Sequence, residues 1–143
     1  MNDNDATYRP IIRTQADLDA AWRHLIGAFA FDGRSVWMMT IEADQRPIPH
    51  VTEFSELDEL PGATFLRQLT GLLRRVFDEV PPDRLAFLVS RPGVDGVRPA
   101  DRAWALALHQ LARDLSLGCD VVHLATDLDV VPLPLDELDT VTA

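Results

Sequence analysis

The chain has 143 residues, the size of one domain, so we expect 1–143 to fold as a single unit with loosely held ends at about 1–12 and 135–143. Its 13 basic residues, all arginines, are outnumbered by 23 acidic ones, and the formal net charge is −10. Because phosphate repels a net anion, this charge argues against nucleic acid and anionic membrane as partners. The single cysteine, Cys119, excludes an internal disulfide and a multi-cysteine zinc site.

The beginning of the sequence predicts a cytoplasmic protein. Residues 1–9 are polar and contain Asp3 and Asp5, which differs from the basic and then apolar profile of a secretory signal. No apolar run approaches the roughly 18 residues that a membrane span requires.

The first elements in chain order are a helix and a strand. Thr14 and Asp17 have the spacing of an acidic capping box, and apolar residues then recur at helical spacing until the chain reaches Gly33. The apolar run 35–41 is too short for a helix and rich in β-prone residues. It predicts a strand that is buried on both faces.

A hairpin and a second helix follow. The range 48–54 predicts the partner strand of the hairpin, and Pro47 and Pro49 place it at a sheet edge because proline cannot donate to a β-ladder. The range 63–80 has its apolar residues on one helical face, which predicts an amphipathic helix stopped by the Pro81-Pro82 pair.

The second half predicts a central strand at 85–90, then a loop and a long helix. Pro99 suits the first turn of that helix, which we expect to run to about Leu117 with Gly118 as its stop. Two final strands are expected at 120–125 and 130–133.

The predicted order is therefore α-β-β-α-β-α-β-β. A strand, a long helix and another strand in succession imply crossover connections that lay helices over a sheet. This order predicts an α/β (α+β) class with a mixed sheet flanked by helices.

The order of strand, loop and helix in the second half of the sequence resembles that of a known family. An apolar strand, Leu-Ala-Phe-Leu-Val-Ser, runs into Arg-Pro-Gly, and a loop then reaches Arg-Pro-Ala-Asp-Arg at the start of the long helix. This layout resembles the RadC-like branch of the JAB/MPN metalloprotease superfamily, where the strand runs into H-x-H-P-S-G and the helix starts at P-S-x-x-D. With the preceding hairpin and helix, the resemblance spans about 34–133. It implies a JAB/MPN-like (cytidine-deaminase-like) fold.

The sequence departs from that family where the family binds zinc. The resemblance places the two histidine ligands at Val89 and Arg91 and an acidic ligand near Asp101, while Arg34 or Ser35 stands near the position of the catalytic glutamate. Valine and arginine do not bind zinc, and one carboxylate cannot hold a catalytic zinc ion. We therefore expect a domain without metal, cofactor or zinc-dependent peptidase activity.

The loop between the central strand and the long helix is a candidate anion site. Helix N-termini favour anions, and arginines gather here in an otherwise acidic chain. The alternative is that these arginines pair with Asp95 and Asp101. The candidate ligand-binding residues are Ser90, Arg91, Arg98, Asp101, Arg102 and His123, the last on a neighbouring strand.

Two functions remain open at this stage. The first is a non-catalytic JAB-like binding or interaction module that forms a homodimer or binds one protein partner. The second is a metal-independent enzyme or a binder of a small anionic ligand at this loop. Although Ser90, His123 and Asp101 can be drawn as a nucleophilic set, no G-x-S-x-G context surrounds the serine, and we assign no catalytic residue.

Overall fold

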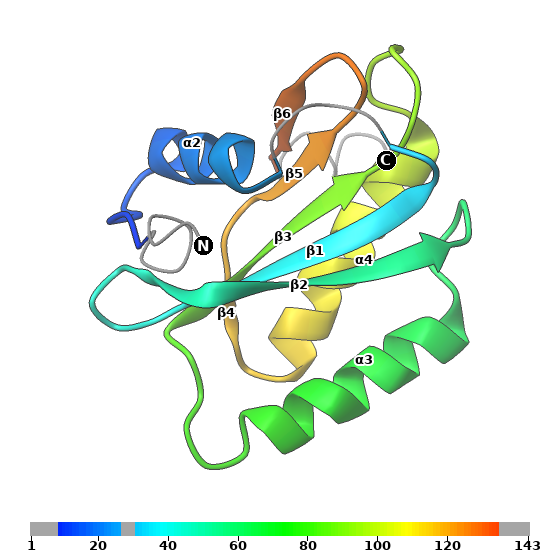
Figure 1. Ribbon diagram of the computed structural model, residues 1–143. Helices are drawn as coiled ribbons and strands as arrows, with labels where there is room; N and C mark the ends of the chain where they lie inside the picture. Colours follow the sequence, from blue (N-terminus) through cyan, green and yellow to red (C-terminus); the bar gives the residue numbers. More distant parts are fainter. Residues whose placement is uncertain (1–8, 27–30, 135–143) are drawn as a thin grey trace.

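A mixed β-sheet carries helices on both of its faces (Figure 1). The computed structural model describes residues 9–26 and 31–134. The described helices are α2 (Gln15–Ile26), α3 (Ala63–Val76) and α4 (Pro99–Asp114), and the described strands are β1 (Arg34–Ile41), β2 (Pro47–Leu57), β3 (Arg84–Ser90), β4 (Gly118–Cys119), β5 (Val122–Ala125) and β6 (Val130–Leu133). The mixed α/β class is thus confirmed.

The strand order is β2-β1-β3-β5-β6, with the short β4 also pairing with β3. The pairs β2–β1, β1–β3 and β5–β6 are antiparallel, whereas β3 runs parallel to β4 and β5. Two parallel neighbours need a crossover, and α4 supplies it between β3 and β5. As predicted, β2 lies at an edge and β1 is buried along most of its length.

Alternation along the central strand divides the core into two parts. Leu85, Phe87 and Val89 pack with α3 and α4 on one face of the sheet, which we call the α4 face. Ala86 and Leu88 pack with α2 on the other, the α2 face. Since successive strand residues point to opposite faces, the side to which any β3 neighbour points can be read from the register.

The chain before α2 is fastened to the sheet. The hydroxyl of Thr14 accepts the Asp17 N–H, and the Asp17 carboxylate accepts the Thr14 N–H, so the predicted capping box is present. Ile12, which lies in the range expected to be loosely held, is buried and donates its N–H to Gln45 O at 2.7 Å. The ranges 1–8 and 135–143 lie outside the described residues, as do 27–30 at the predicted end of this helix.

The predicted end of α3 at residue 80 is wrong, since the helix ends at Val76. Phe77 leaves the helical conformation, with φ −108° and ψ 21°, and its side chain packs against the core. Val76 and Val80 stay exposed, so the apolar pattern that extended the predicted helix does not correspond to a continuous buried face.

The predicted end of α4 at about Leu117, with Gly118 as its stop, is also wrong, because the helix ends at Asp114 and the left-handed residue that follows is a serine. Ser116 takes the left-handed conformation, with φ 57°. Its N–H donates to Arg113 O, and the N–H of Leu117 donates to Ala112 O at 2.9 Å, which together form a Schellman motif. Gly118 instead lies in β4, where an added Cβ would approach Arg84 Cβ to 3.0 Å.

The strand predicted at 120–125 begins later, at Val122, and the structure has an additional short strand, β4, at Gly118–Cys119, which the sequence did not predict. The chain pairs with β3 at β4, leaves the ladder at Asp120 and Val121, and rejoins it at β5. Asp120 uses this break to accept two hydrogen bonds from the Arg84 Nε at 2.8 Å. The observed order among the described residues therefore has three strands after α4 in place of the predicted two.

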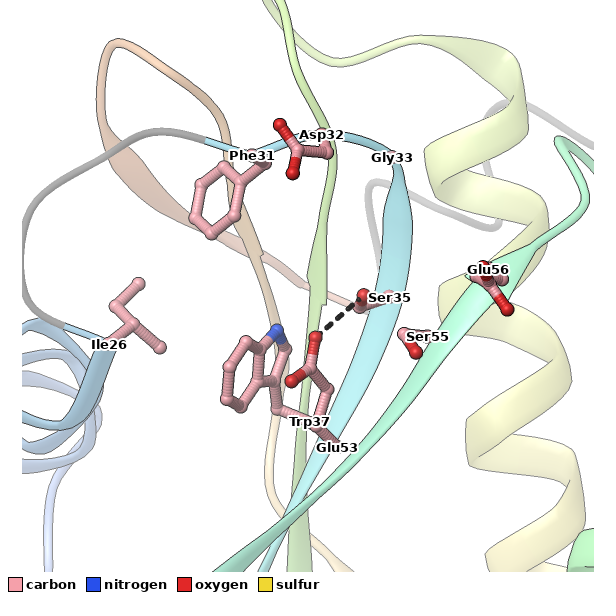
Figure 2. A pocket seen from close by; sticks show the side chains of 9 residues that line it. All are labelled: Ile26, Phe31, Asp32, Gly33, Ser35, Trp37, Glu53, Ser55 and Glu56. Atoms are coloured by element: carbon pink, nitrogen blue, oxygen red, sulfur yellow. Dashed lines mark hydrogen bonds between the residues drawn. The ribbon is translucent and has the colours of Figure 1, made fainter.

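Part of the α2 face is left open. α2 covers β6, and a hollow of about 570 Å³ lies between the end of that helix and strands β1 and β2 (Figure 2).

Across the described residues, no helix combines the length and the apolar character needed to cross a membrane.

The misassigned helix stop provides a test of the fold. A left-handed residue with a Cβ costs about 1 kcal/mol, so we expect Ser116→Gly to raise the free energy of unfolding by up to about that amount. Gly118→Ala should lower it, because its Cβ would meet backbone and side-chain atoms near 3 Å. Urea unfolding of both variants measures this. A destabilising Ser116→Gly would contradict the Schellman end.

Candidate functional site

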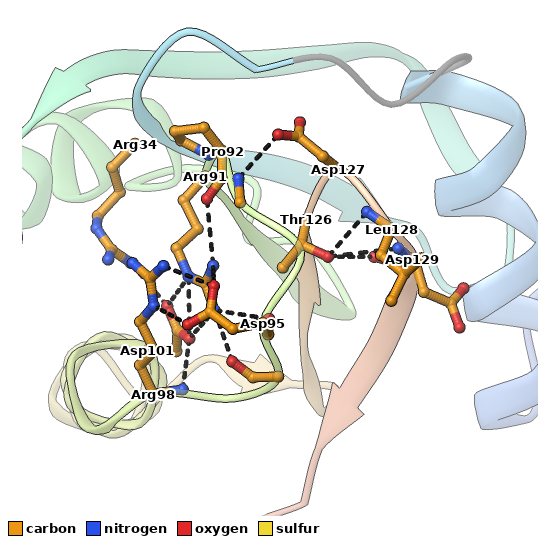
Figure 3. A network of polar contacts seen from close by, with 12 residues as sticks. Arg34, Arg91, Pro92, Asp95, Arg98, Asp101, Thr126, Asp127, Leu128 and Asp129 are labelled. Atoms are coloured by element: carbon orange, nitrogen blue, oxygen red, sulfur yellow. Dashed lines mark hydrogen bonds and ion pairs between the residues drawn. The ribbon is translucent and has the colours of Figure 1, made fainter.

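The carboxylate of Asp101 is the centre of a buried ion-pair cluster at one end of the sheet (Figure 3). Its side chain is fully buried, and Arg34 and Arg91 are almost so. Arg34 Nη1 donates to Asp101 Oδ1 at 3.0 Å. Arg91 donates from Nε to Oδ1 at 2.9 Å and from Nη2 to Oδ2 at 2.8 Å. One carboxylate thus accepts from two guanidinium groups, and we call these three residues the Arg-Asp-Arg cluster.

Strand register brings the two arginines together. Ser35 of β1 pairs with Ser90 of β3 in an antiparallel ladder, so Arg34 lies opposite Arg91 directly beyond that pair. Both side chains point to the α4 face, because each is two residues from a strand residue that packs there. Like charges at opposed positions repel each other. The first turn of α4 supplies the carboxylate that lies between them.

The remaining donors of Arg91 are taken by its own loop. Nη2 donates to Gly96 O at 2.8 Å, and Nη1 donates to Pro92 O at 3.2 Å and lies 3.6 Å from Asp95 Oδ1. The guanidinium is 2% exposed. A buried arginine with its donors in use holds the loop closed and has no free fork for an added anion.

Two aspartates hold the outside of the loop. The carboxylate of Asp95 accepts from both Nε and Nη2 of Arg98, which is a bidentate pair at the surface. Asp127 accepts the Gly93 N–H at 2.8 Å and the Phe31 N–H at 3.2 Å. Gly93 has φ 108°, a conformation that favours glycine, and an added Cβ would lie 3.2 Å from Arg98 Nη2. The loop is therefore tied to β1 and to the β5–β6 turn.

Opposing effects act on the ionisation of Asp101. Burial alone raises the pKa of this carboxyl, but hydrogen bonds from Arg91, the Arg98 N–H and Arg34 outweigh burial and hold the pKa below its ordinary value. The Arg98 N–H bond, 2.8 Å long, also caps the first turn of α4. Asp101 is thus ionised at neutral pH and serves the helix start, as the alternative interpretation of the loop expects.

The six candidate residues divide between the two faces of the sheet. Arg91 and Asp101 lie on the α4 face, whereas Ser90 and His123 point to the α2 face, since their ladder partners pack there. Ser90 Oγ accepts from Trp37 Nε1 at 2.9 Å. Arg98 pairs with Asp95, and Arg102 is half-buried. The structure does not bring the six side chains into one cleft.

His123 and Cys119 lack the surroundings of a reactive side chain. His123 Nδ1 lies 3.2 Å from Val121 O, and its Nε2, which has no hydrogen-bond partner, is 3.9 Å from Asp19 Oδ2. Burial lowers the pKa of His123 even though the Asp19 carboxylate opposes it. Burial raises the pKa of the Cys119 thiol to about 12, so it is protonated at neutral pH.

Arg34 is the member of the cluster that sequence reasoning assigns no binding role. The resemblance places Arg34 or Ser35 near a catalytic glutamate, and the structure brings Arg34 into contact with Asp101. The sequence signal that could have identified it is the arginine at the head of a strand buried on both faces, where an unpaired charge is costly.

These residues do not fit a zinc ion. Val89 offers no donor, Arg91 is a cation, and both oxygens of Asp101 already accept from guanidinium groups. Over 9–26 and 31–134, no three histidine, cysteine, aspartate or glutamate side chains gather as metal ligands would. The cluster satisfies itself without a metal.

The sequence matches no model of a known protein family and no curated protein. The resemblance to the JAB/MPN superfamily therefore stays a prediction from the sequence.

Removing the central carboxylate should lower the domain's free energy of unfolding by a large amount. Asp101→Asn leaves two buried guanidinium groups without a counter-charge, and we expect a loss of about 3–5 kcal/mol in the free energy of unfolding. Asp95→Asn is the matched control, because it removes an exposed carboxylate from the same loop and should have little effect. Equal urea midpoints for the two variants would contradict the central role of Asp101.

Mild acid should destabilise the fold through its buried histidines. Burial lowers the pKa values of His109 and His123, so the folded state keeps them neutral while the unfolded chain takes up protons near pH about 6.5. The stabilisation is therefore complete above that pH and is lost as the pH falls toward the folded pKa values. Urea unfolding at about pH 7.5 and 5.5 should show a smaller loss for His123→Gln than for wild type, with exposed His50→Gln unchanged. A pH-independent unfolding free energy contradicts this.

Proposed function

We propose that this protein is a JAB-like domain of the cytoplasm in which an ion-pair cluster stands in the place of the metal centre, and that it acts as a non-catalytic binding or interaction module. Its partner is a second copy of the chain or another protein. The observation that carries the proposal is that Arg34 and Arg91 both pair with the carboxylate of Asp101.

The resemblance and the geometry meet at the same residues. The resemblance places Arg34 or Ser35 near the position of the catalytic glutamate, the two zinc-binding histidines at Val89 and Arg91, and the acidic ligand near Asp101. Arg34 is far from Arg91 and Asp101 in sequence, yet both arginines contact the Asp101 carboxylate. A convergence of this kind supports a common arrangement with the JAB/MPN superfamily, in which guanidinium groups have replaced metal ligands.

The same contacts argue against hydrolysis at this position. A catalytic zinc keeps a coordination position open for water or substrate, whereas the Asp101 carboxylate here accepts from two guanidinium groups and all three side chains are buried. Replacing a metal by an ion-pair cluster keeps strand β1, strand β3 and helix α4 joined. The fold is thereby retained for a role other than chemistry.

An anion-binding function at the loop has less support. Arg91 and Asp101 are committed to each other, and the exposed fork of Arg98 holds Asp95. Arg102 is the remaining arginine of the set. An anion that binds at Arg98 would first have to displace Asp95.

Metal analysis of purified protein tests the proposal. We expect far less than one zinc per chain after purification in zinc-containing buffer, and no change in the midpoint of thermal unfolding when zinc or EDTA is added, since ligand that binds only the folded state raises that midpoint. Stoichiometric zinc that EDTA removes with loss of stability is the result that would overturn it. The matched control is Cys119→Ser, which shows whether any bound zinc sits at the thiol.

A further inference from the structure

The hollow on the α2 face is a feature of the surface that the ion-pair cluster does not explain. Figure 2 shows Ile26, Phe31 and Trp37 along one side and the carboxylates of Glu53 and Glu56 toward the edge strand. Ser35 and Ser55 complete the polar side, and Asp32 lies at the rim of the β1 end. A pocket of this size with an apolar wall and a few convergent polar groups has the make-up of a ligand site.

The aromatic wall is held in place. Of the three tryptophans, Trp22 and Trp104 are buried in the two cores, whereas Trp37 is half-buried and lines the pocket. Its indole Nε1 donates to Ser90 Oγ at 2.9 Å, which fixes the ring. The aromatic surface of Trp37, together with Phe31, can receive a flat or cationic group.

The charge of the pocket has one sign. Asp32, Glu53 and Glu56 line it, and no arginine does. Elsewhere in the described chain, many carboxylates are paired with arginine, but these three form no ion pair with a described residue. Glu53 Oε2 instead accepts a hydrogen bond from the nearly buried Ser35 hydroxyl at 3.0 Å, which orients its carboxylate within the pocket.

A β-bulge places Glu56 on this side of the sheet. Arg34 pairs with Leu57 and Val36 with Phe54, so Ser55 and Glu56 together oppose Ser35. Glu56 has φ 57°, an unusual conformation for a residue with a Cβ. Without the extra residue, alternation would send Glu56 to the face opposite that of Ser55. The bulge therefore adds a second glutamate to the pocket.

The pocket borders an unpaired strand edge. β2 ends the strand order, and its outer edge pairs with no strand among the described residues. An extended segment added beside β2 would place every second side chain on the α2 face, next to Glu53 and Ser55. This position suits a side chain of a partner protein.

We infer that this pocket binds an arginine side chain of a partner protein whose extended segment lies along β2. A planar guanidinium stacks on an aromatic face and pairs with carboxylates through two hydrogen bonds, which matches Trp37 beside Glu53. The inference rests on the proposed function, for which it names the partner's chemistry.

NMR titration tests the inference on the full chain. The probe is acetyl-Thr-Val-Arg-Val-Thr-amide, and the signal is the Trp37 indole N–H, with Trp22 and Trp104 as internal controls because both are buried. We expect saturable movement of the Trp37 signal, and about tenfold weaker binding when citrulline, which is neutral and nearly isosteric, replaces the peptide's arginine. The lysine peptide should bind more weakly than the arginine peptide.

Two double variants separate the pocket from general electrostatics. E53Q/E56Q removes two carboxylates that line the pocket and should weaken binding about tenfold or more. D58N/E59Q makes the same change in net charge at the next exposed acids along the chain, outside the pocket, and should bind like wild type.

Three results would overturn the inference. They are an unmoved Trp37 signal, a citrulline peptide that binds as tightly as the arginine peptide, and argininamide that binds as tightly as the peptide, which would exclude a partner segment. Metal content measured on the same sample distinguishes failure of this inference from failure of the proposed function. If the protein is zinc-free and does not bind the peptide, only the inference is overturned. Stoichiometric zinc overturns the proposed function whether or not the peptide binds.

Discussion

The contact between Asp101 and two guanidinium groups is the constraint on which this structure depends. Register places Arg34 and Arg91 opposite each other at one end of the central sheet, where they are shielded from water and would repel each other. The carboxylate removes that repulsion and also caps α4 through the Arg98 N–H. The start of β1, the end of β3 and the start of α4 are thereby held at one point. Burying three charges is costly, so the cluster stabilises the fold only as a complete set.

The two faces of the sheet differ in how their charged groups are paired. On the α4 face the charged groups satisfy one another, and the arginine-rich loop is closed over them. On the α2 face the helix covers only part of the sheet, and Glu53 beside Trp37 and Glu56 across the pocket form no ion pair with a described residue. The charged groups behind the net charge of −10 are therefore paired unevenly. Arg91 and Arg98 of the loop pair with carboxylates of the same chain, whereas the carboxylates of the pocket form no ion pair with a described residue.

Local signals in the sequence predicted the elements well and their ends less well. The capping box at Thr14 and the edge position of β2 follow from side-chain spacing and from proline chemistry. The end of α4 at Asp114 does not, because the left-handed residue beyond it is Ser116 and a glycine stands two positions later. The break between β4 and β5, where Asp120 contacts Arg84, is not visible in a local pattern either.

The candidate site shows the same limit. That Arg91 could pair with Asp101 was open from the sequence, because the two residues are near each other along the chain. The participation of Arg34 was not, since it depends on the register between β1 and β3. The assignment of Ser90 and His123 to a shared cleft with Arg91 required knowledge of which face each strand residue points to. One residue of register decides that face.

We propose that guanidinium groups occupy the carboxylate that a JAB-type metal site would use. Anomalous diffraction at the zinc absorption edge, from crystals grown with zinc, tests this arrangement. We expect no zinc peak at Asp101, with Arg34 and Arg91 at hydrogen-bond distance from its oxygens. A peak at about 2.0–2.2 Å from an Asp101 oxygen, with either arginine turned away, would contradict it.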